Sequence, residues 1–339
     1  GADNLAWEKA IKSNVGIEGK LFNNKIDFVV DIFHDQRNGI FQQRVQVPEF
    51  VGVVSNPYAN VGKMKSYGAD GNISFTQDFT PDFGFTLRGN FTYSKNKVQN
   101  WEQAYLEYPY LEYNNFPYNS IRGYQAVGLF KDEDDIKYSP KQTFGEVMPG
   151  DIKYKDVNGD GVVSSLDETA IGGTYNPQIV YGFGANFRYK NLDFNIFFQG
   201  NGMTYGFKGG CSNKFTPGET MGAMGNILTN YQDRWTVENP SQDVYYPRLT
   251  WGKSENNVRN STWWLENMSF LRAKDIEIGY TLPKSWVRQI GLSNIRLYAK
   301  GSNLFTFSKF DLWDPEVDTS VGTKYPIMKS FSAGFDINF

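Results

Sequence analysis

The stretch Ser330-Phe331-Ser332-Ala333-Gly334-Phe335-Asp336-Ile337-Asn338-Phe339 decides the fold. Every odd-numbered residue in it is apolar, and every even-numbered residue is polar or glycine. Strict alternation predicts a β-strand with one apolar and one polar face, because successive side chains of a strand point to opposite sides. The same pattern recurs upstream in long, aromatic-rich copies, separated alternately by short and long connections. We therefore predict a transmembrane β-barrel, in which only alternate residues face lipid.

The connections between these strands fall into two classes. Short turns are predicted at Asn23-Asn24, where asparagine tolerates positive φ, at Thr80-Pro81-Asp82 and at Lys190-Asn191. Long segments lie between the hairpins, and the longest, residues 99–178, exceeds an ordinary loop so far that we expect it to be functional and locally folded. The predicted fold is all-β, an antiparallel transmembrane β-barrel segment with long extracellular loops. Its strands, about nine of a larger barrel, cover residues 14–22, 26–32, 67–75, 83–93, 181–189, 192–198, 276–282, 295–299 and 331–339.

The second face of each predicted strand carries Asp, Arg, Asn and Gln. Each charged residue would cost a few kcal/mol at the middle of a bilayer but little in a wet lumen, so we expect this face to line a lumen. A soluble antiparallel sheet with one polar face exposed is the alternative. Strand length and the asymmetry of the loops favour the barrel.

Composition excludes several classes of protein. The 339 residues have a net charge of −3, which offers no attraction to nucleic acid, and no apolar run is long enough for a transmembrane helix. Aromatic residues make up 17%, an excess that suits aromatic girdles or a carbohydrate-binding surface. Cys211 is the sole cysteine and His34 the sole histidine, and no nucleophile motif lies near either. We therefore predict that the chain is not an enzyme.

A series of motifs, in order and spread over nearly the whole chain, resembles one family. On these motifs the chain resembles the C-terminal part, here residues 1–339, of the barrel of SusC/RagA-type TonB-dependent outer-membrane transporters of Bacteroidetes. The motifs are Trp7-Glu8-Lys9, Phe22-Asn23-Asn24-Lys25, Gly123-Tyr124, Gly128-Leu129-Phe130, Pro149-Gly150-Asp151-Ile152-Lys153-Tyr154-Lys155-Asp156-Val157-Asn158-Gly159-Asp160-Gly161, Asn176-Pro177, Phe197-Phe198-Gln199-Gly200, Arg234-Trp235-Thr236, Phe270-Leu271-Arg272, Gly279-Tyr280-Thr281-Leu282-Pro283, Asn303-Leu304-Phe305-Thr306, Asp314-Pro315-Glu316 and Tyr325-Pro326.

The resemblance implies nutrient import across the outer membrane of a Gram-negative cell. Members of the family are barrels of roughly 22 strands with a plugged lumen, embedded in outer-membrane lipid. They take up oligosaccharides or peptides from a SusD-like surface lipoprotein, with energy supplied by the TonB complex through an N-terminal plug. We find no plug, TonB box or N-terminal strands, so we interpret the chain as a barrel fragment. The resemblance also implies that the terminal Phe339 is an assembly signal for membrane insertion.

A calcium-loop-like motif occupies residues 156–167, within the longest loop. It has side-chain oxygens at positions 1, 3 and 5, glycine at position 6 and a carboxylate at position 12, as in calcium-binding loops. No helix precedes it, and a simple chain reversal without an ion is the alternative. We predict a structural Ca²⁺ that holds the outer loop in place. Its ligands would be Asp156, Asn158, Asp160, the carbonyl of Val162, Ser164 through water, and Asp167.

Aromatic residues interleaved with acids and amides follow the fourth strand. Aromatic rings stack on the apolar faces of sugars, and polar groups bind the hydroxyls, so the composition suits a ligand site. Girdle packing or contact with the lid lipoprotein is the alternative interpretation for each residue. The candidate ligand-binding residues are Trp101, Tyr105, Tyr108, Tyr110, Trp263 and Trp264.

Two other classes of function remain in competition with import. The closer rival is a soluble β-rich module that binds calcium and carbohydrate, for example in adhesion. A glycosidase with paired carboxylates is more distant, because no acid lies in a recognisable catalytic motif. The particular glycan or peptide cannot be predicted, since specificity in such a scaffold lies in its variable loops.

Overall fold

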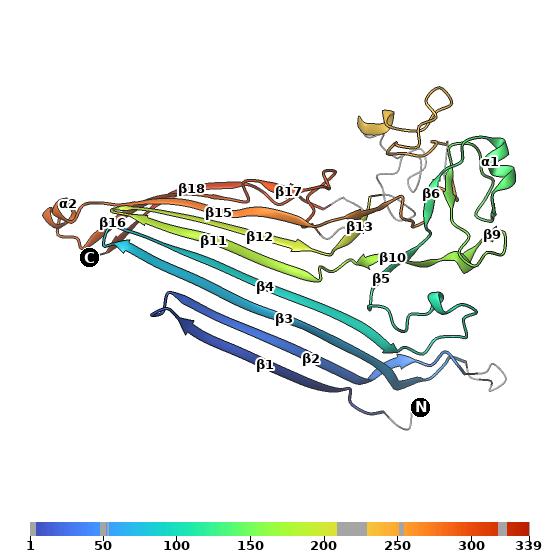
Figure 1. Cartoon of the computed structure of the whole chain (residues 1–339), viewed down its shortest axis with the longest axis horizontal. Coiled ribbons are helices and arrows are strands. Elements are labelled where there is room, and N and C mark those ends of the chain that lie inside the picture. The colour runs from blue at the N-terminus through green and yellow to red at the C-terminus, as the bar shows by residue number, and fades with distance from the viewer. Residues whose placement is uncertain are drawn as a thin grey trace.

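The computed structural model describes residues 5–47, 52, 54–208, 229–250, 254–317 and 324–338. One large antiparallel sheet dominates it, with strands in the order β1-β2-β3-β4-β11-β12-β15-β16-β18 (Figure 1). All nine predicted strands are present, and several are longer than predicted. Their bounds are β1 Lys9–Leu21, β2 Ile26–Gln43, β3 Tyr58–Thr80, β4 Phe83–Asn100, β11 Ile179–Tyr189, β12 Leu192–Gly202, β15 Phe270–Thr281, β16 Asn294–Ser302 and β18 Ser330–Asn338, and a short strand, β17 Thr306–Ser308, also pairs with β15.

The short connections gather at one end of the sheet, which we call the turn end. In the first hairpin Phe22, Asn23 and Asn24 have φ of 54°, 56° and 64°, the left-handed conformation that asparagine accepts at low cost. Lys190, with φ of 52°, turns the chain between β11 and β12. The connection from β15 to β16 holds a short helix, α2 Lys284–Gln289, which projects beyond the strands at the left of Figure 1.

The opposite end of the sheet carries a second structure, built from the long connections. We call its described residues, 101–178, 203–208, 229–250 and 254–269, the loop unit. The predicted loop 99–178 has secondary structure of its own from residue 109 onward, although residues 99 and 100 belong to β4 and its core is completed by the other long connection. The elements of the loop unit are η2 Pro109–Leu111, β5 Ser120–Gly123, β6 Ala126–Leu129, α1 Glu133–Tyr138, β7 Lys141–Gln142, β8 Ile152–Tyr154, β9 Val162–Val163, η3 Ser165–Asp167, β10 Thr169–Thr174, β13 Tyr205–Phe207, η5 Thr229–Gln232 and β14 Leu265–Asn267.

The buried apolar cluster of the described residues lies in the loop unit. Members come from both long connections, so side chains distant in sequence share one core. β10 pairs with β5, β6 with β8, β7 with β9, and β13 with β14 around it. The cluster comprises Ile121, Tyr124, Leu129, Ile152, Tyr154, Val163, Phe207, Trp235, Tyr246 and Trp264.

The large sheet has the two faces that alternation predicts. On one face polar side chains bond across strands: Thr76 to Thr86 at 3.1 Å, and Arg88 to Asn195 at 3.2 Å. On the other face large apolar side chains are exposed, among them Val15, Ile17, Ile32, Phe183, Ile278 and Phe335. A sheet that leaves this much apolar surface uncovered needs an apolar medium or partner on that side.

The sheet is open along both sides in the part of the chain that the structure describes. β1 pairs only with β2 there, and β18 pairs only with β16. An unpaired strand edge presents free N–H and C=O groups and is a template for further pairing. Among the described residues, no helix has the length and apolar character needed to cross a membrane.

Candidate functional site

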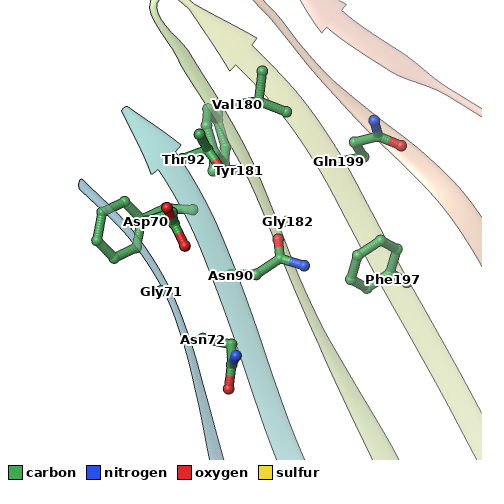
Figure 2. A pocket seen from close by; sticks show the side chains of 11 residues that line it. Asp70, Gly71, Asn72, Asn90, Thr92, Val180, Tyr181, Gly182, Phe197 and Gln199 are labelled. Carbon is green, nitrogen blue, oxygen red and sulfur yellow. The ribbon is translucent and has the colours of Figure 1, made fainter. Parts of the chain in front are cut away.

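A groove of about 500 Å³ lies on the polar face of the sheet, across β3, β4, β11 and β12 (Figure 2). Most of its polar lining consists of groups that hydrogen-bond without changing charge. Such a lining holds or passes a polar solute. The lining residues are Asp70, Gly71, Asn72, Asn90, Phe91, Thr92, Val180, Tyr181, Gly182, Phe197 and Gln199.

Phe197 is an aromatic ring on the polar face of the sheet, and our sequence analysis missed it. A Cβ atom added to Gly182 would come within 2.7 Å of the ring, and one added to Gly184 within 2.9 Å, so the ring occupies space that two glycines leave free. The Arg88 guanidinium lies 5.2 Å from the ring centroid, on the same polar face. The alternation Gly182-x-Gly184 on the neighbouring strand was the signal that a ring lies here.

Nearer the turn end, one arginine ties four strands together. Arg296 of β16 bonds Asp193 of β12 at 2.5 Å and Glu277 of β15 at 2.6 Å, and it lies 3.5 Å from Asp336 of β18. Gly279 lies beneath the guanidinium, where an added Cβ would come within 2.4 Å of Arg296 Nη2. With three carboxylates around one guanidinium, the network carries an excess of negative charge on this part of the polar face.

Trp101, alone among the predicted ligand-binding residues, lines a second pocket, of about 380 Å³, at the base of the loop unit. Trp101 packs against Tyr118, with ring centroids 5.9 Å apart, and Tyr113, Arg122 and Glu168 also line the pocket. Aromatic rings beside one cation and one anion are an arrangement that suits a polar organic ligand.

The other members of the first aromatic group lie apart from that pocket. Tyr108 and Tyr110 stack on each other with centroids 5.4 Å apart, and the Tyr110 hydroxyl donates to the carbonyl of Leu166 at 2.8 Å. Tyr105 is 90% exposed and stands free at the surface. The structure thus brings together Trp101 with residues that were not predicted, and it separates Trp101 from Tyr105.

Trp264 is a correction to the predicted ligand set. Its side chain is 0% exposed, and its indole N–H donates to the carbonyl of Asn257 at 2.7 Å. It therefore forms the centre of the loop-unit core and has no surface for a ligand. Trp263 is partly buried against that core and donates to the carbonyl of Tyr245 at 3.2 Å.

Residues 156–167 fold as a compact loop held by its own hydrogen bonds. Asp156 accepts from the N–H groups of Gly159 at 2.7 Å and Gly161 at 2.8 Å. Asn158 Oδ1 accepts from Asp160 N at 3.1 Å, and Asp160 Oδ1 accepts from Val162 N at 2.8 Å. The first three predicted ligand positions therefore lie on one tight turn, each aiming an oxygen inward at the backbone.

The carboxylate at position 12 of the same loop, that of Asp167, accepts hydrogen bonds from the backbone. Asp167 is fully buried, and it accepts from the N–H groups of Val157 and Ser164, both at 2.7 Å. Ser164 caps η3 by accepting from Leu166 N at 3.1 Å, so it too has a structural bond. Within the described residues no group of three or more His, Cys, Asp or Glu side chains is placed to hold a metal. Calcium binding stays a prediction.

An ion pair with a buried carboxylate joins the two long connections, and sequence reasoning did not anticipate it. Asp151 accepts from Arg248 Nε and Nη2, both at 3.0 Å, and from Asn257 Nδ2 at 2.8 Å. Next to it Gly150 has φ of 87° and lies against Trp235, where an added Cβ would come within 2.2 Å of the indole ring. The Pro149-Gly150-Asp151-Ile152 motif therefore serves the packing of the loop unit.

A second buried arginine connects β15 to a later motif. Arg272 bonds Asp314 at 2.5 Å and Glu316 at 3.1 Å, and its side chain is almost completely buried. The Asp314-Pro315-Glu316 motif thus holds a loop against the end of the sheet. The predicted assembly signal, Phe339, lies outside the described residues.

Comparison with known proteins gives this geometry its context. No protein-family model matches the chain. TonB-dependent receptor P3 of Formosa agariphila is 26% identical over 362 residues, which cover 99% of this chain and 35% of the receptor. TonB-dependent receptor SusC of Bacteroides thetaiotaomicron is 24% identical over 348 residues, covering 99% of this chain and 32% of SusC. The RagAB peptide importer in its open-open state superposes with a TM-score of 0.76 at 25% identity, over 99% of this chain and 35% of the matched chain.

The fold and these similarities match the chain to a segment of the barrel of TonB-dependent receptors. The chain is homologous to the TonB-dependent receptors, SusC among them, along nearly its whole length. It spans about a third of the length of the relatives that it matches. Those relatives are receptors and transporters, which agrees with the prediction that the chain is not an enzyme.

Proposed function

We propose that the chain forms part of the wall of a TonB-dependent importer in the outer membrane of a Gram-negative bacterium. In this proposal the chain is the C-terminal portion of the barrel, the apolar face of the sheet meets lipid, and the polar face lines the lumen. The imported solute is an oligosaccharide or a peptide. The partners are a SusD-like surface lipoprotein at the loop end and the TonB complex, acting through parts of the protein that precede this chain.

The observation that carries the proposal is the division of the sheet into two chemically different faces. Nine strands present exposed apolar residues on one side, while the other side bears cross-strand bonds such as Arg188 to Asp78 at 2.8 Å. In water the apolar side would be a large exposed hydrophobic surface that promotes aggregation. In a barrel the apolar side would contact lipid and the polar side would contact the water of the lumen. The same division argues against the rival reading as a soluble calcium- and carbohydrate-binding module.

The test uses the whole gene product that carries this chain. We expect it to sediment with outer membranes, to need detergent for extraction, and to migrate differently in electrophoresis before and after boiling, as folded barrels do. Deleting the gene should abolish uptake of one class of glycan or peptide, and a surface lipoprotein should co-purify with the tagged protein. A product that folds as a compact monomer without detergent would contradict the proposal.

The pocket around Trp101 supports a more specific part of the proposal, that the imported solute contacts the base of the loop unit. Trp101, Tyr113 and Tyr118 offer ring faces there, beside Arg122 and Glu168. Trp101→Ala in the whole protein should weaken solute binding, while Tyr105→Ala, at an exposed site away from the pocket, should leave it unchanged. Unchanged affinity in the Trp101 variant would count against a ligand role for this pocket.

A structural Ca²⁺ in residues 156–167 is a separate part of the proposal. Asp156, Asn158 and Asp160 place side-chain oxygens at positions 1, 3 and 5 of a tight turn, the positions that supply ligands in calcium-binding loops. The carbonyl of Val162 and the side chain of Ser164 follow at positions 7 and 9. Asp167 would have to share its buried carboxylate between the ion and the backbone. We expect added calcium to raise the melting temperature of the protein and Asp160→Ala to abolish the increase. A parent protein that does not respond to calcium would defeat this part alone.

A further inference from the structure

The helix α2 at the turn end has three chemically distinct sides. Val287 is buried against the protein, which fixes the rotation of the helix. Trp286 and Ile290 are 62% and 64% exposed, and they share a side because residues four apart lie one above the other. Lys284 and Arg288, also four apart and exposed, share the opposite side. The six-residue helix, with Ile290 as its C-cap, therefore exposes a tryptophan–isoleucine pair opposite two cations and is strongly amphipathic.

The end of this helix is held firmly, so the two apolar side chains have a fixed position. Leu292 N donates to Val287 O at 3.3 Å and Gly291 N to Arg288 O at 3.1 Å, the pair of bonds that closes a helix in a Schellman motif. Gly291 supplies the left-handed residue that this motif requires, with φ of 75°. Pro283 precedes the helix, where its fixed φ suits the entry of the chain.

The turn end around α2 carries further residues of both kinds, exposed aromatic side chains and basic side chains. Exposed aromatic side chains follow the same end of the sheet: Phe22, Phe79, Tyr189 and Tyr280. The four turn-end connections, residues 22–25, 80–82, 190–191 and 283–293, contain four basic residues and one acidic residue, namely Lys25, Lys190, Lys284, Arg288 and Asp82. None of the four cations forms an ion pair with a described residue of the chain, in contrast to the paired cations of the polar face.

We propose that α2 is an interfacial anchor: Trp286 and Ile290 insert into the lipid leaflet at the turn end, and Lys284 and Arg288 contact phospholipid phosphates. Tryptophan is favoured at the boundary between headgroups and acyl chains, where its ring is apolar and its N–H is wet. Basic residues beside such a helix add attraction to anionic lipid. The occupant is phospholipid because α2 lies at the end of the sheet where exposed aromatic side chains and an excess of basic over acidic residues occur together, a combination that matches the boundary between acyl chains and phosphates. The inference rests on the proposed function, since it requires the wall to be in a membrane.

The test places an environment-sensitive NBD fluorophore on single cysteines in the whole gene product. Cys211 and any cysteine elsewhere in the gene product are first replaced by serine, and the protein is reconstituted into nanodiscs of phosphatidylcholine and phosphatidylglycerol. Labels are introduced by Trp286→Cys and, as a matched control on the same helix, by Ser285→Cys, about 100° around the axis. Tyr105→Cys in the loop unit gives the aqueous reference, and Ile278→Cys on the apolar face of β15 gives the reference for the wall.

We expect the label at 286 to emit at shorter wavelength than the labels at 285 and 105, and to be quenched more by a shallow lipid-borne quencher than by a deep one. Emission at 286 like that at 105, together with a quenched label at 278, would overturn the anchor while leaving the barrel intact. An unquenched label at 278 would instead overturn the proposed function. The double substitution Lys284→Glu and Arg288→Glu should shift emission at 286 toward the aqueous value, and no shift would overturn the contact with phosphate.

Discussion

The large sheet of nine long strands, which we call the wall, exposes apolar and charged side chains, whereas the loop unit buries such side chains in its core. In the loop unit a tryptophan, Trp264, is sealed in a core, whereas in the wall Ile17, Ile32 and Phe335 stand exposed. In the Arg248–Asp151 pair of the loop unit the carboxylate is fully buried and the arginine 25% exposed, whereas the side chains of the Arg188–Asp78 pair of the wall are 55% and 63% exposed. The proposed function explains the difference: the loop unit buries its apolar side chains in a core of its own, whereas the wall would expose its apolar face to lipid.

The largest effect is expected from emptying the core of the loop unit. Trp264→Ala removes a fully buried ring and its hydrogen bond to Asn257, and such substitutions cost about 3–5 kcal/mol. Amides of the loop unit should lose hydrogen-exchange protection, while the strands of the wall keep theirs. Tyr105→Ala is the control, because that ring is exposed. Equal loss of protection in the loop unit and in the wall would mean that the two regions unfold together. It would contradict the claim that the loop unit is stabilised by a core of its own.

The matched pair of salt bridges gives the next largest effect. Arg248→Met leaves the buried carboxylate of Asp151 without its cation, which costs about 3 kcal/mol, although Asn257 still donates to it. Arg188→Met breaks a bridge of similar length, 2.8 Å, in an exposed site, and solvent screening limits its worth to about 0–1 kcal/mol. Chemical denaturation of both variants measures the contrast. If the two substitutions destabilised the protein equally, burial of the carboxylate would not determine how much an ion pair contributes to stability.

A charge on the apolar face tests the wall directly. Ile278→Lys should cost about 1–2 kcal/mol in a bilayer, less than a lysine at the middle of the membrane would, because Ile278 lies close to the turn end of β15. In water a lysine at this exposed site would cost almost nothing, so the size of the effect reports the medium. Thr86→Lys, on the polar face, is the control and should be tolerated. Folding yield in vesicles is the measurement, and a neutral Ile278→Lys would contradict a lipid-facing wall.

The wall was predictable from sequence because its rules are local. Alternation assigns each residue of a strand to a face without knowledge of its partners, and Asn23-Asn24 specifies a tight turn by its own conformational preference. Strand ends were less predictable. β3 spans Tyr58–Thr80 because pairing with β2 and β4 extends it past the apolar residues that revealed it.

The loop unit was not predictable because its contacts are distant in sequence. Asp151 and Arg248 are 97 residues apart, and nothing near Asp151 indicates an arginine partner. Trp263 and Trp264 are adjacent and chemically identical, yet only Trp264 is fully buried, a distinction set by the fold around Asn257 and Tyr246. Phe197 was missed for a related reason, since its role depends on glycines of the neighbouring strand.

The smallest expected effect concerns the pH dependence of one ion pair of the loop unit, between Asp135 of α1 and Lys153 of β8. The side-chain hydrogen bond from Lys153, at 2.7 Å, lowers the pKa of Asp135 below its ordinary value and outweighs the opposing effect of partial burial. A carboxylate whose pKa is lowered by folding stabilises the protein above the ordinary aspartate pKa. That contribution is lost as the pH falls through the lowered pKa.

The variant Lys153→Met isolates this contribution from the other acids that titrate in the same range. We expect it to destabilise the loop unit by about 1 kcal/mol or less at neutral pH, because both side chains are about a quarter exposed. The difference between parent and variant should shrink as the pH drops below 4, where Asp135 becomes protonated in the unfolded and then in the folded protein. Melting curves of the loop unit at several pH values give this difference. A difference that stays constant with pH would show that Lys153 acts through packing on Phe130, whose ring centroid is 5.7 Å from the ammonium, and not through its charge.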